Sequence, residues 1–481
     1  MTSTELLSRL SAIVGEAAVM HGEAILPELT TDEGLLSRTA APVAVVTPAT
    51  TEQVAAIVSV AREHRVPLTA RGSATGLSGG CVPVRGGIVV SFAAMRKILE
   101  IDLENHVAVV QPGVTLYELD GAVRPHGLLY PVQPGEQSSS LGGNVGTNAG
   151  GMRAVRYGVT RHNVLGLEMV LGTGEIVRSG GKFVKSSSGY DLTQLVIGSE
   201  GTLALVTEVT VKLQPLLAHT ATVLAPFAAL REITAAISPI VGSGLMPSIL
   251  EYIDSLTMQS ITASEGLDLA ISEDLRQRAS AFLVVVLEQR TEEALEKDLE
   301  SLADLLTGAG ALDVFVLPGL AAASLVRARE RAFYVAKAAG ADEIVDVVLP
   351  RARIADFLET AGKLAADHGC FAIGCGHAGD GNIHLSVFQP SSEQREGFLS
   401  ELFSAGIGLG GAISGEHGIG TAKQHAFLDL EPPGRIALMR RIKSAFDPDT
   451  ILNPDKIMGT GLPAGEGHAD RSDDESRVSR P

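Results

Sequence analysis

The chain has 481 residues, and its 56 acidic against 38 basic side chains give a net charge of −18. Such an acidic chain offers no basic surface for nucleic acid or for an anionic membrane. Three cysteines are too few for a disulfide scaffold, and the absence of Trp argues against base-stacking platforms. Apolar runs stay far below the ~20 residues of a membrane-spanning helix, and no basic signal region opens the chain. The sequence therefore predicts a cytoplasmic protein without a transmembrane segment.

The first 215 residues predict short strands and helices in alternation. The chain opens with apolar residues at helical spacing over 6–14, which predicts an amphipathic helix. Thr50 and Gln53 then have the spacing of a capping box within a strand–helix–strand unit, and Gly172–Gly174 separates two strands as a hairpin turn would. We expect strands at 43–47, 66–70, 88–92, 98–102, 107–111, 165–171, 175–177 and 203–213, and helices at 55–64 and 115–123.

Beyond Gln214 and Pro215 the pattern changes to longer helices that alternate with strands. Two roughly repeated strand–helix–strand units predict an α+β sandwich with its helices on one face. The expected strands are 220–225, 248–253, 282–288, 313–317, 344–349 and 383–388, and the expected helices are 230–238, 292–306, 324–338, 354–367, 393–405 and 435–446.

These changes in pattern divide the chain into five segments. An N-terminal helical segment precedes a first domain, a second domain follows, and a short C-terminal segment leads into a tail rich in Gly, Asp, Ser and Arg. This composition predicts that the tail is disordered. The segments are 1–36, 37–215, 216–433, 434–458 and 459–481.

Two glycine-rich stretches carry the first functional signal. A predicted strand runs into the first stretch at Arg71–Gly80, and the second spans Pro134–Arg153, with short hydroxyl side chains among the glycines of both. Backbone N–H groups in such loops can form a concave site for a diphosphate, although Gly/Ser clusters also mark ordinary flexible loops. The flanking strands favour a nucleotide site. The GxGxxG patterns at 374–379 and 406–411 lack the strand and helix context of a Rossmann site.

A second signal is a group of histidines and a glutamate in the second half. His377 and His384 flank a tight Asp-Gly turn, so both imidazoles can point to one place, and Glu416 adds a carboxylate. Two imidazoles and one carboxylate form an open site for Zn²⁺, Mn²⁺ or Fe²⁺. Spacing alone leaves metal ligation and ordinary hydrogen-bonded histidines as open alternatives.

Three neighbours of these residues have their own predicted roles. His417 follows Glu416 and can remain metal-free as a general base. Cys375 is expected to be a small buried residue, because no second cysteine stands at CxxC spacing. Asp380 is expected to shape the turn or to accept a hydrogen bond from a ligand histidine.

Residues 40–215 resemble the two-lobed FAD-binding domain of the vanillyl-alcohol oxidase / p-cresol methylhydroxylase superfamily, in the segments 70–80, 134–140, 147–153 and 198–204. The resemblance implies that the first loop holds the pyrophosphate, the next two flank the ring and ribityl chain, and the last lies near the adenosine. Since residues 71–80 contain no His, it also implies non-covalent FAD. It assigns to FAD the residues Ala70, Arg71, Gly72, Ser73, Ala74, Thr75, Gly76, Leu77, Ser78, Gly79, Pro134, Gly135, Ser138, Ser139, Ser140, Gly142, Gly143, Asn144, Thr147, Asn148, Gly150, Gly151, Arg153, Gly198, Glu200 and Gly201.

Over residues 40–458 the chain is similar to the branch of that superfamily that contains the flavin-binding component of glycolate oxidase, D-lactate dehydrogenase and D-2-hydroxyglutarate dehydrogenase. The carrying motifs are the segments 376–384, 414–420 and 447–456. The resemblance implies a substrate (cap) domain at 216–433 and a C-terminal segment that returns to the flavin. The resemblance implies that His377, His384 and Glu416 are metal ligands, with Zn²⁺ favoured, and that His417 is the catalytic base. It also implies that Arg329 binds the substrate carboxylate and that Asn453 contacts the flavin.

Two points stay open within that resemblance. Arg327 and Arg331 lie close enough to Arg329 in sequence to be alternatives for the carboxylate. Members that oxidise 2-hydroxyglutarate carry an extra Lys on the strand before an Asp-x-x-x-Pro segment, whereas residues 343–350 contain none. This difference favours a monocarboxylate substrate.

The implied activity is FAD- and metal-dependent oxidation of a D-2-hydroxy monocarboxylate, such as D-lactate or glycolate, to the 2-oxo acid by hydride transfer to flavin N5. The alternatives are D-2-hydroxyglutarate dehydrogenase, a non-redox transferase like alkylglycerone-phosphate synthase, and a metal-dependent hydrolase. The expected partners are the hydroxy acid, a second copy of the chain in a homodimer, and an electron acceptor, which is a quinone, an iron–sulfur subunit, an electron-transfer flavoprotein or a cytochrome. Through this acceptor the cytoplasmic protein could lie at the inner face of the membrane.

Overall fold

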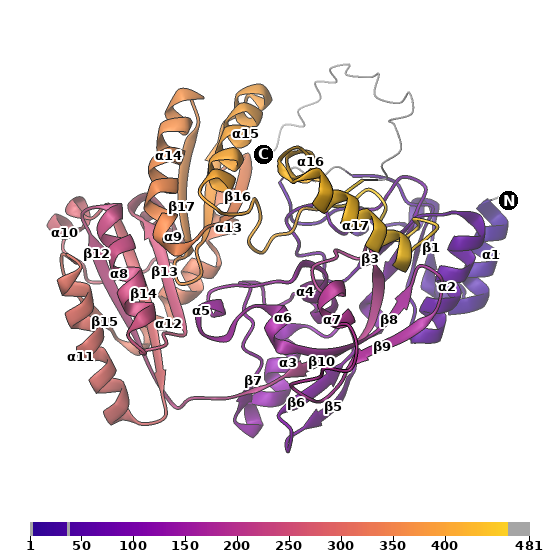
Figure 1. Cartoon of the computed structure of the whole chain (residues 1–481), viewed down its shortest axis with the longest axis horizontal. Helices are drawn as coiled ribbons and strands as arrows, with labels where there is room; N and C mark the ends of the chain where they lie inside the picture. The colour runs from indigo at the N-terminus through magenta and orange to yellow at the C-terminus, as the bar shows by residue number, and fades with distance from the viewer. Residues whose placement is uncertain (1–2, 36–38, 460–481) are drawn as a thin grey trace.

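The computed structural model describes residues 3–35 and 39–459, which form two domains side by side (Figure 1). Helix α1 (Ser3–Val14) packs at the outer edge of the first domain, and helix α17 (Pro433–Phe446) follows the second domain and lies back over the first. The predicted disordered tail falls outside the described residues except for its first residue, Gly459. No helix in the described part of the chain is both long and apolar enough to cross a membrane.

The first lobe of the first domain is a four-stranded sheet of order β1-β2-β4-β3, in which β2 and β3 lie parallel to β4. Helix α2 (Thr51–His64) and helix α1 bury their apolar faces against it. The Thr50 side chain accepts a hydrogen bond from the Gln53 N–H, which confirms the predicted start of α2. The strands are β1 (Val19–Met20), β2 (Ala44–Val46), β3 (Leu68–Arg71) and β4 (Ile88–Ser91).

The second lobe is an antiparallel sheet of order β5-β6-β10-β8-β9. The predicted hairpin around Gly172–Gly174 is confirmed, since β8 and β9 pair directly. Helix α3 (Leu116–Val123) begins with a capping box between Thr115 and Glu118. The remaining elements are β5 (Ile98–Asp102), β6 (Val107–Val110), β7 (Leu128–Leu129), β8 (Val164–Leu171), β9 (Ile176–Gly180), α7 (Leu192–Val196), β10 (Ala204–Lys212) and β11 (Gln214–Pro215).

The composition of the second glycine-rich stretch predicts turns. In the structure this stretch also contains a helix, α4 (Leu141–Thr147). Ser140 caps this helix by accepting from the Gly143 N–H. A Cβ at Gly142 would lie 2.6 Å from Cβ of Pro112, so the helix can approach this residue only because Gly142 has no side chain. Tertiary packing therefore overrides the low helix propensity of glycine. Two single-turn helices follow, α5 (Ala154–Tyr157) and α6 (Thr160–Asn163).

The second domain is built on a seven-stranded sheet of order β15-β12-β14-β13-β17-β18-β16, whose neighbouring strands are all antiparallel. The α+β class predicted for this domain is confirmed. Its strands are β12 (His219–Phe227), β13 (Ile249–Asp254), β14 (Ala281–Gln289), β15 (Phe315–Leu317), β16 (Glu343–Val348), β17 (Phe371–His377) and β18 (Asn382–Phe388).

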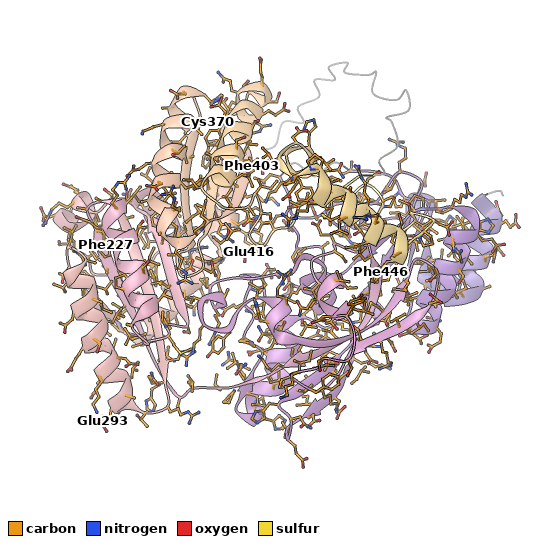
Figure 2. The ribbon with its side chains drawn as sticks, in the orientation of Figure 1. Phe227, Glu293, Cys370, Phe403, Glu416 and Phe446 are labelled. Carbon is orange, nitrogen blue, oxygen red and sulfur yellow. The ribbon has the colours of Figure 1, made fainter. Side chains whose placement is uncertain are left out.

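The prediction that helices cover only one face of this sheet is wrong. Four long helices bury the main core, to which Phe227 and Phe403 belong (Figure 2). A smaller apolar cluster on the opposite face joins Phe282 and Cys375 to other helices. The helices of the main core are α8 (Leu230–Gly242), α11 (Glu292–Gly308), α14 (Ile354–Asp367) and α15 (Ser392–Gly408), and those of the opposite face are α9 (Ser255–Ser264), α10 (Glu273–Arg278) and α12 (Gly319–Glu330).

Other elements also differ from the sequence prediction, which did not include helices α9, α10 and α16 (Gln424–Leu430). Strand β17 was not predicted, because Gly374 and Gly376 weaken the strand pattern; a Cβ at Gly374 would overlap the carbonyl oxygen of His384 on β18, so the close pairing requires glycine there. The helix predicted over 324–338 is interrupted at Arg331, where the backbone leaves helical geometry. It forms α12 and α13 (Ala332–Ala338).

The C-terminal segment runs from the second domain back to the first. Helices α16 (Gln424–Leu430) and α17 precede residues 447–458, and Leu452 forms a parallel bridge with Leu68 on β3. The Lys443 ammonium donates to the carbonyl oxygens of Thr202 and Leu452 and lies 2.5 Å from the Asp447 carboxylate. Residues 443–452, which follow the second domain, thus contact Leu68 and Thr202 of the first domain.

Candidate active site

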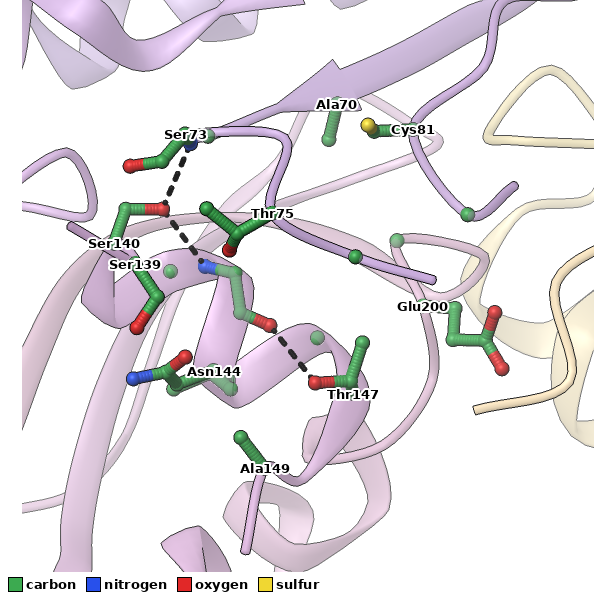
Figure 3. Close-up of a pocket in the computed structure, with 18 of the residues that line it drawn as sticks. Ala70, Ser73, Thr75, Cys81, Ser139, Ser140, Asn144, Thr147, Ala149 and Glu200 are labelled. Carbon is green, nitrogen blue, oxygen red and sulfur yellow. Dashed lines mark hydrogen bonds between the residues drawn. The ribbon is translucent and has the colours of Figure 1, made fainter. Parts of the chain in front are cut away.

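A cavity of about 210 Å³ lies in the first domain between the loop after β3 and helix α4 (Figure 3). It brings together residues from the segments 70–80, 134–140, 147–153 and 198–204, and Glu416 and His417 of the second domain close part of it. The predicted residues that line it are Ala70, Gly72, Ser73, Ala74, Thr75, Gly76, Leu77, Ser78, Pro134, Ser139, Ser140, Gly142, Gly143, Asn144, Thr147, Gly150, Glu200 and Gly201.

The wall of this cavity has the chemistry of a dinucleotide site. The buried Ser139 Oγ and Asn144 Nδ2 have no hydrogen-bond partner among the described residues, and both side chains line the cavity. The Ser140 hydroxyl accepts from the N–H groups of Ser73 and Gly143, at 3.3 and 3.4 Å (Figure 3). A Cβ at Gly72 would overlap Ser140 Oγ, so only glycine permits this approach. Unpartnered donors beside glycine backbone fit FAD.

Several predicted FAD residues lie outside this cavity and have other contacts. Arg71 donates to the carbonyl oxygens of Thr31 and Glu28, and Arg153 lies 2.7 Å from the Glu288 carboxylate of the second domain. The Asn453 amide donates to the carbonyls of Gly80 and Glu200. Gly135 and Gly151 line a neighbouring cavity instead, and the remaining residues outside the first cavity are Gly79, Ser138, Asn148 and Gly198.

The predicted metal ligands lie close together, and one of them, Glu416, is seen in Figure 2 where the second domain faces the first. His377 ends β17 and His384 lies on β18, and the tight turn between these strands brings their ring centroids to 5.1 Å. Oε1 of Glu416 lies 3.2 Å from Nε2 of His377 and 3.3 Å from Nε2 of His384. One ligand atom from each residue thus lies within 4.8 Å of the others.

A buried carboxylate on β13 organises this group. Glu251 is 1% exposed; its Oε1 accepts from Nδ1 of His377 at 2.6 Å, and its Oε2 lies 2.8 Å from Nη2 of Arg329. Burial disfavours a charged imidazole, but the carboxylates of Glu251 and Glu416 outweigh burial and raise the pKa of His377 well above its ordinary value. Nδ1–H donates to Glu251, and Nε2 faces Oε1 of Glu416 at 3.2 Å; loss of the Nε2 proton would leave a lone pair at this point for a cation. This donor set fits a divalent cation.

Asp346 on β16 holds the loop that carries Glu416 and His417. It is fully buried, and its Oδ2 accepts from the backbone N–H groups of Gly415, Glu416 and His417 at 3.1, 3.2 and 2.8 Å and from the Ser414 hydroxyl at 2.7 Å. Burial alone would raise its pKa, but nearby cationic groups and these donors hold the pKa of Asp346 well below its ordinary value.

His417 lies beside this carboxylate and lines both cavities. Its Nδ1 is 3.9 Å from Oδ2 of Asp346, and its ring stacks on that of His384 at 5.1 Å between centroids. Burial lowers the pKa of His417 to about 4, with Asp346 opposing the shift. The side chain is therefore neutral near pH 7, which a general base requires.

The three candidate arginines separate clearly in the fold. Arg329 is 8% exposed and lines the second cavity. Arg327 is exposed and donates to the Ser324 hydroxyl, and Arg331 is exposed and pairs with Glu265. Only Arg329 of the three reaches the cavity that contains the histidines.

The two cavities share a wall, and the second has a volume of about 150 Å³. Glu416 and His417 form this wall together with Thr75, Leu77, Pro134 and Glu136. Glu200 of the first domain fixes the loop that contributes Glu416 and His417 to this wall, because its carboxylate accepts from the N–H groups of Ile419 and Gly420, both at 2.7 Å. A ligand in the first cavity and a small molecule in the second would thus meet at His417.

Sequence reasoning did not identify Glu251 and Asp346 as site residues. Each is an acidic residue inside an otherwise largely apolar strand, Ile249–Asp254 or Glu343–Val348, which also has a second acid at one end. An acid that interrupts such a run is the signal that could have found them, because a buried carboxylate requires partners.

Comparisons with known proteins agree with this geometry. Residues 42–180 match the family described as "FAD binding domain", and residues 216–457 match "FAD linked oxidases, C-terminal domain". The chain is also similar in architecture to p-cresol methylhydroxylase with substrate bound, with a TM-score of 0.77, 18% identity and coverage of 94% of this chain and 96% of that one.

Relatives along the whole chain are closer in sequence. An uncharacterized FAD-linked oxidoreductase of Mycobacterium tuberculosis is 53% identical over 456 residues, which cover 95% of this chain and 99% of that protein. A glycolate oxidase subunit GlcD of Bacillus subtilis is 38% identical (86% and 89% covered), and a D-lactate dehydrogenase of Anaerostipes hadrus is 37% identical (91% and 94% covered). The chain therefore belongs to the FAD-linked oxidases, and it has the fold of the vanillyl-alcohol oxidase / p-cresol methylhydroxylase superfamily that its sequence predicts.

Proposed function

We propose that this FAD-linked oxidoreductase oxidises a D-2-hydroxy monocarboxylate, of the D-lactate or glycolate type, to the 2-oxo acid with the help of a divalent cation. The observation that carries the proposal is the shared wall: His417 and Glu416 line both the dinucleotide cavity and the cavity that contains Arg329, His377 and His384. The D-lactate dehydrogenase and glycolate oxidase relatives support it.

The residues that would hold the two groups are those described above. The glycine-rich loop after β3 and helix α4 would hold FAD without a covalent bond, and His377, His384 and Glu416 would hold the cation, for which we propose Zn²⁺ over Mn²⁺ or Fe²⁺. When bound, the flavin supplies an acceptor for hydride at N5, and the cation supplies a Lewis acid beside the substrate hydroxyl.

The protein's own groups would orient the substrate and accept its proton. The Arg329 guanidinium would bind the carboxylate through two parallel hydrogen bonds, with Glu251 holding it at 2.8 Å. Nε2 of His417, the nitrogen that does not face Asp346, would take the hydroxyl proton. Asp346, with its depressed pKa, stays ionised and stabilises the imidazolium that forms. The C2 hydrogen then leaves with its electron pair, and the 2-oxo acid remains.

The test is anaerobic reduction of the purified yellow protein. D-lactate is expected to bleach the flavin absorbance and L-lactate to leave it unchanged. If the protein were a transferase like alkylglycerone-phosphate synthase, no 2-hydroxy acid would bleach its flavin. If it were a metal-dependent hydrolase, there would also be no bleaching, and the protein would be colourless.

Removal of the cation is expected to suppress flavin reduction while the flavin stays bound. The reason is that the hydroxyl keeps its ordinary high pKa without a Lewis acid beside it. The protein is treated with a chelator and dialysed, its metal content is measured, and reduction is followed before and after Zn²⁺ is returned. An unchanged reduction rate in metal-free protein would reject the proposed role of the cation.

Glu251→Gln is expected to weaken cation binding by about 10–100-fold, because the carboxylate fixes the ring of His377. The measurement is the metal content that survives dialysis against graded chelator concentrations. Glu265→Gln on the surface is the matched control, since Glu265 pairs only with the exposed Arg331 in the contacts described. Equal metal retention in both variants would show that Glu251 has no part in the site.

A further inference from the structure

The second cavity extends beyond the proposed cation ligands over the inner face of three strands. On β18, His384, Ser386 and Phe388 all line it, because alternate residues of a strand share a face. Ser386 pairs with Ile344 on β16 and with Ile373 on β17, and both isoleucines line the cavity. We call the part of the cavity lined by these strands the floor. One two-residue step along β18, about 7 Å, leads from His384 to the Ile-Ser-Ile row, made by Ile344, Ser386 and Ile373 across the floor.

Helices on another wall add both apolar and polar side chains. Helix α9 contributes Ile261 with Thr257 and Ser260, helix α13 contributes Phe333, Val335 and Ala336 with Tyr334, and Ala339 follows α13. On the floor, Ile344, Ile373 and Phe388 are only half-buried, although each lies in a strand of a helix-covered sheet. These side chains thus present apolar surface to the cavity.

Charge in this cavity disfavours a second anionic group. Arg329 is the only Lys or Arg that lines it in the described part of the chain, and it already faces Glu251 at 2.8 Å. Three carboxylates line the same cavity, those of Glu136, Glu330 and Glu416. A side-chain carboxylate on the Ile-Ser-Ile row would lose water without a Lys or Arg to pair with it.

We propose that the substrate side chain on C2 is an apolar group larger than methyl, branched aliphatic or aromatic, which lies on Ile344, Ile373 and Phe388. The inference rests on the proposed function, which places the carboxylate at Arg329 and the hydroxyl near His417. The whole cavity, about 150 Å³, has to hold the carboxylate and hydroxyl end of the substrate as well as this side chain. Each added methylene that is buried there raises the affinity of the site about fourfold.

The first experiment compares anaerobic flavin reduction of the holoenzyme by D-2-hydroxy acids that differ only in side chain. The series is glycolate, D-lactate, D-2-hydroxy-4-methylpentanoate, D-3-phenyllactate and D-2-hydroxyglutarate. We expect the second-order rate constant to rise at least 10-fold from D-lactate to the 4-methylpentanoate or phenyl compound, and to fall at least 10-fold for 2-hydroxyglutarate. A maximum at glycolate, D-lactate or 2-hydroxyglutarate would overturn the inference.

A single substitution tests the floor itself. Ile344→Lys should lower the rate constant for 2-hydroxy-4-methylpentanoate at least 10-fold and raise that for 2-hydroxyglutarate relative to wild type. The matched control is Ile176→Lys on β9, where Ile176 is 44% exposed, and its preference should equal that of wild type. An unchanged preference in the Ile344→Lys variant, with its flavin retained, would reject the floor as the side-chain subsite.

Binding of the 2-oxo acids separates this inference from the proposed reaction. Calorimetry on the holoenzyme should show tighter binding of 4-methyl-2-oxopentanoate than of 2-oxoglutarate. If this preference holds but no hydroxy acid bleaches the flavin, the subsite stands and the proposed reaction fails. If D-lactate bleaches the flavin but 2-oxoglutarate binds more tightly, the proposed reaction stands and the subsite fails.

Discussion

Replacing His417 with Ala is expected to slow flavin reduction about 10²–10⁴-fold while the flavin remains bound. Among the described residues, His417 is the one histidine that lines both cavities, and burial keeps it neutral near pH 7 by lowering its pKa to about 4. Without it, the histidines that line the second cavity among the described residues would be only His377 and His384, the two proposed cation ligands, and no free imidazole would remain to accept the hydroxyl proton. Stopped-flow reduction under anaerobic, saturating substrate measures the chemical step separately from acceptor turnover.

The matched control is His425→Ala on helix α16, where the imidazole is 93% exposed and pairs with Asp429. This variant should reduce its flavin at the wild-type rate. A flavin spectrum of normal intensity in both variants would show that the cofactor site is intact. Normal reduction in the His417→Ala variant would remove this residue from the proposed mechanism and leave the base unassigned.

Short local patterns made much of the site predictable from the sequence. His377 and His384 flank a tight turn that contains Gly381, so local geometry brings these two side chains together, whereas Glu416, 39 residues from His377, was placed with them only by the family resemblance. The glycine-rich loop after β3 was also predictable from a short local pattern. The strand–helix–strand order of the first domain followed from hydrophobic periodicity, and the cap at Thr50 fixed the start of α2.

Contacts between distant parts of the chain were not predictable. Glu251 meets His377 across 126 residues, and Glu200 meets Gly420 across 220. Neither separation leaves a pattern in one sequence, because sheet order decides which strands become neighbours. The same reason explains why Arg327, Arg329 and Arg331 could not be separated. Their burial depends on how helix α12 and the break after it at Arg331 pack, and only tertiary structure shows that Arg329 lines the cavity.

Asp346→Asn is expected to destabilise the protein by about 3–5 kcal/mol and to abolish flavin reduction, because it breaks a buried charged network. Oδ2 of Asp346 accepts three backbone N–H groups and the Ser414 hydroxyl, and it lies 3.5 Å from the Lys423 ammonium. An amide leaves Lys423 without its counter-charge. The single oxygen of this amide could accept the backbone N–H groups of the loop only if its NH₂ group took the place of Oδ1, which lies 3.7 Å from Nδ1 of His384.

The pH dependence distinguishes this network from a general loss of packing. The folded pKa of Asp346 lies well below the ordinary value of 3.8, so its contribution to stability is complete above that value and is lost only as the pH falls through the lower, folded pKa. The stability difference between wild type and Asp346→Asn, measured by unfolding from pH 8 to pH 5, should therefore stay constant. Asp274→Asn, at an aspartate whose side chain is 78% exposed, should change stability by less than about 0.5 kcal/mol. If the stability difference shrank between pH 8 and pH 5, the Asp346 carboxylate would not be held ionised by its partners. His417 would then lack the fixed negative charge that the proposed mechanism places beside it.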